Sequence, residues 1–129
     1  MRRLGAVVAA ASLLLVCCAS PRNSLGAGST ACFKAIPAAV SEVGRKGSLV
    51  GVRQVNAARL AQRRPEFRRF GNENLCLVAF RGNFQPGDLP GAGSAQAGRY
   101  AVVAVDSRRA TVVATYVMDH LPLRFRHPV

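Results

Sequence analysis

RYAVVAVDSRRATVVATYVM, residues 99–118, is the stretch that decides the fold. Residues 100–105 and 111–118 are rich in Val, Thr and Tyr, which favour a pleated strand over a helix. The polar break between them, residues 106–109, lacks the Asn-Gly or Asp-Gly pair of a two-residue turn. We therefore predict an antiparallel hairpin with a loop of about three to five residues.

Two further apolar runs, residues 48–55 and 75–80, are predicted to extend this sheet. Four apolar residues before them have the spacing of one helical face. These residues are Phe33, Ile36, Val40 and Val43. Pro37 fits only the first turn of a helix, so the helix starts at Ile36 or Pro37, or Phe33 belongs to an extended lead-in. The pattern predicts an α+β fold, an antiparallel sheet of about four strands with one main N-terminal helix packed on it.

The connections between these elements are predicted from punctuating residues. Residues 56–64 read as a short helix capped by Asn56 and ended by Pro65. Residues 65–74 are expected to form a polar, charged loop. Residues 82–98 form a second, long loop of the kind that is functional or mobile, and its Gly, Ala and Ser residues favour mobility.

The start of the chain is typical of a secretory signal peptide. A basic Met-Arg-Arg end precedes 13 uncharged, mostly apolar residues and then small residues. The apolar run is shorter than the roughly 20 residues that a membrane-spanning helix needs. We expect residues 1–18 to be a leader, residues 19–30 a flexible Gly/Ser-rich tether and residues 31–129 one small domain.

Two cleavage sites remain open for this leader. The segment Leu15-Val16-Cys17-Cys18 resembles a bacterial lipobox, and that resemblance implies lipidation of Cys18 and anchoring to the membrane of the cell envelope. Cys17 departs from it, because Gly or Ala is usual at that position. Ordinary cleavage after Ala19 is the alternative, and it would give a soluble secreted or periplasmic protein.

Cys32 and Cys76 are the cysteines that remain in the mature chain. Two cysteines in an exported protein favour a disulfide, although two free buried thiols remain the alternative. The bridge would close a loop of about 44 residues and stabilise the fold by roughly 3–4 kcal/mol. No metal site is expected, because there is no CxxC and both histidines lie near the C-terminus.

Charge is strongly biased, with 18 Lys and Arg against 6 Asp and Glu and a net charge of +12. Five arginines gather between the short helix and the polar loop. They are Arg59, Arg63, Arg64, Arg68 and Arg69. They form either a solvated face or a patch that binds anionic envelope polymer or lipid headgroups. Phe67 and Phe70 interleave with them, which favours a contact surface, but no nucleic-acid motif is present and no nucleic-acid partner is expected.

Catalytic motifs are absent from the sequence. It contains no GxSxG, HExxH or phosphate-binding loop, and its six carboxylates are scattered. Asp119 and His120 are adjacent, but neighbours on a strand point to opposite faces. We therefore expect a non-catalytic protein without a cofactor.

The hairpin YAVVAVDSRRATVVATYV resembles that of small exported PepSY-like domains, with Tyr100, Asp106 and Val113 carrying the match. It departs from them in lacking the usual turn glycine, and its long loop and cysteine pair are additional. The resemblance implies a non-enzymatic module that binds or inhibits another exported protein. Together these features predict an exported envelope protein that binds a protein or peptide partner, for instance at a sheet edge. The alternative is a basic adhesion module that holds anionic envelope polymer.

Overall fold

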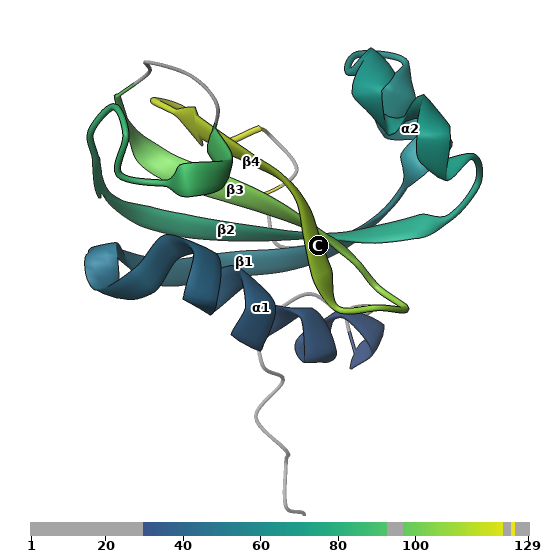
Figure 1. Cartoon of the computed structure of the whole chain (residues 1–129), viewed down its shortest axis with the longest axis horizontal. Helices are drawn as coiled ribbons and strands as arrows, with labels where there is room; N and C mark the ends of the chain where they lie inside the picture. The colour runs from purple at the N-terminus through teal and green to yellow at the C-terminus, as the bar shows by residue number, and fades with distance from the viewer. Residues whose placement is uncertain (1–29, 93–96, 123–124, 126–129) are drawn as a thin grey trace, which may run out of the picture.

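The computed structural model describes residues 30–92, 97–122 and 125. The predicted leader, the tether and Cys18 lie outside these residues. The described part is an α+β domain in which a four-stranded antiparallel sheet, in the order β1-β2-β3-β4, carries the main helix on one face (Figure 1). This architecture confirms the predicted fold class.

The strands follow one another as a meander. Their bounds are Gly47–Asn56 for β1, Asn74–Phe84 for β2, Gly98–Asp106 for β3 and Thr111–Met118 for β4. The bounds of β4 are those predicted, whereas β2 extends four residues further because Phe84 is fully buried. Val113 is the extra residue of an irregularity in the β3–β4 pairing, and β1 has a similar irregularity between Leu49 and Gly51.

The helical layer begins as a 3₁₀-helix, η1 (Thr30–Ala35), and continues as α1 (Ile36–Val43) with Pro37 in its first turn. Val43 packs in the core as predicted, but Phe33 and Val40 are 43% and 44% exposed. The 3₁₀ turn has three residues per turn, so it shifts the phase of the predicted apolar face. The residues that face the sheet are Cys32, Ala35, Ala39 and Val43.

A disulfide joins Cys32 of η1 to Cys76 of β2, as the sequence predicts. Both cysteines are fully buried, and their Cα atoms are 5.5 Å apart. The bridge fixes which side of η1 faces the sheet. It therefore also determines which apolar side chains of the following helix remain outside.

The β3–β4 connection is a four-residue turn, within the predicted length. The buried Asp106 carboxylate accepts hydrogen bonds from the backbone N–H groups of Arg108 and Arg109 at 2.8 and 3.2 Å. The N–H of Ala110 donates to the Asp106 carbonyl at 2.8 Å, and Ala110 adopts a left-handed conformation with φ of 52°. The left-handed region of φ and ψ is disfavoured for a residue with a Cβ atom, so Ala110 is strained at a position where glycine would fit without strain.

A lobe made of α2 (Ala57–Ala61) and a 3₁₀-helix, η3 (Pro65–Phe70), lies beyond the end of β1. The predicted cap is confirmed, because the Asn56 side chain accepts from the Ala58 N–H at 2.9 Å. The prediction of a polar loop over residues 65–74 is wrong. Phe67 is buried against the second face of the sheet and holds η3 in place. This burial could not be predicted, because charged residues surround Phe67 in the sequence.

The predicted loop over residues 82–98 is anchored in its described part. Phe84 and Leu89 are buried, and a short 3₁₀-helix, η4 (Pro90–Ala92), follows. Asp88 pairs with Lys46 at 2.6 Å. This ion pair and a backbone hydrogen bond lower the pKa of Asp88. Residues 84–92 are therefore held to the domain by both apolar and polar contacts.

Candidate functional site

The open edge of β4 is the first candidate site. Thr111–Met118, TVVATYVM, contains no charged residue and no proline. Five of its eight side chains are half-buried and Thr111 is exposed. Among the described strands β4 pairs only with β3, so its other side presents backbone groups that can pair with another strand.

One wall of this edge is the η4 segment. The Glu42 carboxylate of α1 accepts hydrogen bonds from the Gly91 N–H at 2.9 Å and from the Thr115 hydroxyl at 3.1 Å. One acidic side chain therefore ties η4 to the middle of β4. A Cβ atom at position 91 would contact the end of this carboxylate, so a larger residue there would displace the Glu42 side chain from its present position.

The other wall is the α2–η3 lobe, held by Tyr116 of β4. The Tyr116 hydroxyl donates to Glu66 at 2.6 Å, and the Arg64 guanidinium lies 4.4 Å from the centre of the tyrosine ring. Burial, and then the hydrogen bond to Glu66, raise the pKa of Tyr116 well above its usual range. The same hydrogen bond is the largest cause of a lowered pKa at Glu66. At neutral pH the Glu66 carboxylate is therefore charged and accepts the hydrogen bond, and the Tyr116 hydroxyl is neutral and donates it.

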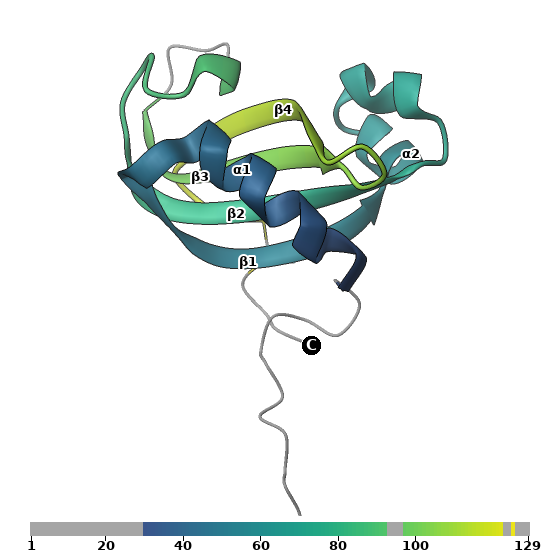
Figure 2. The ribbon, with the colours of Figure 1, turned by 60° about the horizontal axis from the view of Figure 1, so that its bottom comes forward.

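Between the two walls lies a groove of about 850 Å³. Its floor is formed by residues 113–119, and its sides by Arg64, Gly91, Ala92 and Ala97. Figure 2 shows β4 at the upper edge of the sheet, with the green η4 segment near one end and the α2 lobe near the other. The absence of charge in residues 111–118 is the sequence signal that marks this edge.

The arginine-rich surface predicted from the sequence lies on the lobe. All five arginines are exposed: Arg59, Arg63, Arg64, Arg68 and Arg69. Within the described part of the chain, none of the ion pairs involves them. Arg64 turns toward the groove, whereas Arg69 lies 4.7 Å over the ring of Phe70. The idea that Phe67 provides a stacking surface is wrong, because that ring is buried in the core.

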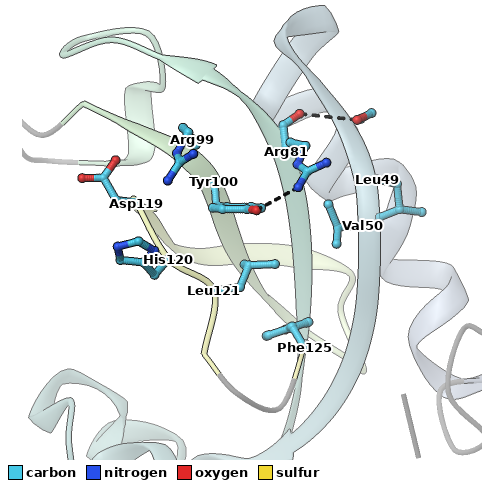
Figure 3. Close-up of a pocket in the computed structure, with 10 residues that line it drawn as sticks. Leu49, Val50, Arg81, Arg99, Tyr100, Asp119, His120, Leu121 and Phe125 are labelled. Carbon is cyan, nitrogen blue, oxygen red and sulfur yellow. Dashed lines mark hydrogen bonds between the residues drawn. The ribbon is translucent and has the colours of Figure 1, made fainter. Parts of the chain in front are cut away.

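A second pocket, of about 720 Å³, lies where β1 and β3 begin and just beyond the end of β4 (Figure 3). It is lined by cationic, polar and apolar side chains, among them Arg81, Arg99, Tyr100, His120, Leu49 and Val50. Arg81 donates to the Tyr100 hydroxyl at 3.1 Å. The sequence interpretation missed this site, because its residues come from four separate strands or strand ends.

Asp119 and His120 both line this second pocket, contrary to the expectation that they point apart. They follow the end of β4, where the alternation of a strand no longer applies. Ser48 also lines the pocket, but its hydroxyl donates to the Arg81 carbonyl at 3.5 Å. Among the described residues, no hydrogen bond joins Ser48, Asp119 and His120.

Two further searches concern the described residues alone. In residues 30–92, 97–122 and 125, no three His, Cys, Asp or Glu side chains gather in a way that could hold a metal ion. Over the same residues, no helix has the length and apolar character needed to cross a membrane.

Comparisons with protein-family models, with curated proteins and with solved structures gave no match to this chain. The resemblance to PepSY-like domains therefore stays a prediction. The fold and the two sites define a small disulfide-bonded α+β domain with an open edge strand. Its function is argued below from that geometry.

Proposed function

We propose that this protein is an exported, non-catalytic protein of the cell envelope that is lipid-anchored through Cys18 and binds a protein or peptide partner. The partner adds an extended segment to β4 as a fifth strand. The observation that carries this proposal is an uncharged edge strand of eight residues beside a groove of about 850 Å³.

The composition of β4 supports a partner on this edge. Proteins usually protect exposed edge strands with charges, prolines or coverings, because unpaired backbone groups otherwise recruit other chains. β4 has the irregularity at Val113 but neither charge nor proline. A β-branched, uncharged edge of this length is suited to pairing with another strand, about 26 Å long at the rise of a β-strand.

The walls of the groove support an extended occupant with acidic character. η4 is linked to β4 through the Glu42 carboxylate, which accepts from Gly91 and Thr115, and the lobe is linked to β4 by the hydrogen bond from Tyr116 to Glu66, so the groove exists before binding. A preformed site lowers the ordering cost of association.

Arg64 lines the groove beside the lobe, and Asp119 lines it beyond the end of β4. Residues 18–129 carry 16 Lys and Arg against 6 Asp and Glu, a net charge of +10, so a carboxylate on the incoming strand would be favoured near Arg64.

Export and anchoring rest on the leader. Residues 1–18 have the pattern of a signal peptide with a lipobox-like end, and residues 19–30 have the composition of a tether. Intact-mass analysis of the native protein tests this part. A diacylglyceryl increment on a chain that starts at Cys18 is expected, whereas an unmodified chain starting at Ser20 would contradict the anchor.

The binding proposal is tested by selecting linear peptides from a random library displayed on phage, with the mature protein as bait. Selected peptides should bind in an extended form and contain Asp or Glu. A Val113→Lys variant should bind them about tenfold more weakly or worse, because a charge then lies at the edge where the strand would pair.

The matched control places the same charge on the opposite edge, at the exposed Gln54 of β1. Gln54→Lys should bind the selected peptides within about twofold of the wild type. Equal weakening by the two variants would indicate charge repulsion in general and would contradict strand addition at β4.

A second function is favoured by the arginine-rich surface of the lobe. Five exposed arginines, Arg59, Arg63, Arg64, Arg68 and Arg69, make no ion pair with the described carboxylates. As a basic adhesion module, they would hold anionic envelope polymer or lipid headgroups. The retention of the protein on phosphocellulose would then fall steeply as the salt concentration rises and when these arginines are replaced by Gln. Peptide binding by strand addition would depend little on either change.

A further inference from the structure

The second pocket offers a ligand site that adjoins the β4 groove, and among the described residues the two share only Asp119. We propose that it binds a single anionic lipid, with the acidic headgroup on Arg81 and Arg99 and the acyl chain against Val50 and Phe125. The pocket combines a cationic end with an apolar rim, and its volume of about 720 Å³ lies in the range of small-molecule sites.

The cationic end comes from two strands that are neighbours in the sheet. Arg81 belongs to β2 and Arg99 to β3, and both line the pocket together with His120. The Arg81 guanidinium donates to the Tyr100 hydroxyl at 3.1 Å and lies 5.7 Å from the ring centre. These contacts orient the guanidinium, and within the described residues Arg81 forms no ion pair that would compensate its positive charge.

Among the described residues, Asp119 is the one carboxylate that lines the pocket. It forms no ion pair with Arg81 or Arg99 within the part of the chain that the structure describes. Two guanidinium groups therefore outnumber one carboxylate, and the pocket has a surplus of positive charge. Arginine is suited to phosphate and carboxylate groups, because its planar fork can donate two hydrogen bonds to one anion.

The apolar rim distinguishes a lipid from a simple anion. Val50 is 40% exposed and is one of the four large apolar residues that the described chain leaves exposed, and Phe125 is half-buried. Val50 is the extra residue at the irregularity of β1, and its side chain lies on the pocket side of the strand, whereas the side chain of Leu49 lies on the other side (Figure 3). An acyl chain that covers Val50 and Phe125 would remove apolar surface from water, which a free phosphate cannot do.

The experiment titrates the mature protein with dihexanoyl phosphatidic acid, dihexanoyl phosphatidylcholine and inorganic phosphate, with backbone amide NMR shifts as the readout. The phosphatidic acid is expected to shift the amides of residues that line the pocket. Inorganic phosphate should bind about tenfold more weakly or worse, and the neutral phosphatidylcholine should bind more weakly still.

Two matched double variants separate the site from general charge. Arg81→Gln with Arg99→Gln should weaken phosphatidic acid binding about tenfold or more. Arg45→Gln with Arg108→Gln removes the same charge at exposed positions outside the pocket and should change binding less than about twofold. If the first pair disturbs the fold, the single variant Arg99→Gln replaces it. The Arg99 side chain makes no hydrogen bond within the described residues, so its replacement should leave the fold intact.

The apolar half is tested by Val50→Ser, which should reduce the affinity for phosphatidic acid toward that for inorganic phosphate. Equal weakening by both arginine pairs would overturn the proposal in favour of general charge attraction. Equal binding of phosphate and phosphatidic acid would overturn the lipid assignment, and equal binding of the neutral lipid would overturn the anion site.

Discussion

The two edge strands of this sheet are protected to different degrees. β1 combines a register irregularity with the charge of Arg53, and η1, which packs beside it, is tied to β2 by the disulfide. β4 has an irregularity as well, but it carries no charge and borders an open groove. From this difference we expect β1 to be the less favourable edge for further pairing, and β4 is the edge at which our proposal places the partner.

The largest expected effect concerns the protected side. Replacing Cys32 and Cys76 with Ser should lower the free energy of unfolding by roughly 3–4 kcal/mol, because the unfolded chain loses a cross-link over 44 residues. Urea denaturation measures this change. If the loss were below about 1 kcal/mol, the idea that the disulfide fixes the β1 side of the domain would be wrong.

The second effect concerns the wall of the β4 groove. Glu42→Ala should lower the free energy of unfolding by about 1–3 kcal/mol, because the buried Thr115 hydroxyl and the Gly91 N–H lose their shared acceptor. The exposed Glu73, whose side chain makes no hydrogen bond within the described residues, provides the control as Glu73→Ala. Similar losses in the two variants would show that η4 is not fixed to β4 through Glu42.

The third effect concerns the turn that sets the register of β4. Ala110→Gly should raise the free energy of unfolding by up to about 1 kcal/mol, because glycine adopts the positive φ of 52° without the clash of a Cβ atom. The entropy of glycine in the unfolded chain offsets part of this gain. Thermal unfolding followed by circular dichroism gives the sign, and a lower midpoint would contradict a strained turn.

The smallest effect is the pH dependence of the lobe contact. The pKa of Glu66 is lowered in the folded protein, so its contribution is present above the usual value of 4.5 and is lost as the pH falls below it. Tyr116→Phe removes the hydrogen bond from Tyr116 to Glu66. The stability difference between wild type and variant should therefore narrow on acidification from neutral pH to below 4.5, and a constant difference would mean that Glu66 is not a charged acceptor.

Much of the fold could be predicted from residue patterns. The β-branched run of residues 111–118 fixed β4, Asn56 marked the start of α2, and the two mature cysteines indicated the disulfide. These features depend on local preferences or on simple pairing. The phase of α1 could not be predicted, because it depends on the 3₁₀ turn and on the tertiary position of Cys32.

The sites were less predictable than the strands. The arginines of the lobe could be predicted as a cluster from their spacing. The burial of Phe67, which fixes the η3 segment that carries Arg68 and Arg69, could not be predicted from so charged a segment. The groove needs Glu42, Gly91 and Thr115, which are up to 73 residues apart. Contacts between residues so far apart in sequence depend on how the helix packs on the sheet. Local sequence patterns do not predict this packing.

The most direct test of strand addition is amide hydrogen exchange of β1 and β4, with and without a peptide selected for binding. If the peptide pairs with β4, amides in Thr111–Met118 should exchange more slowly in the complex, because the edge is then hydrogen-bonded on both sides. Amides of Gly47–Asn56 should keep their exchange rates. Slower exchange at β1, or unchanged exchange in β4 at saturating peptide, would contradict the account.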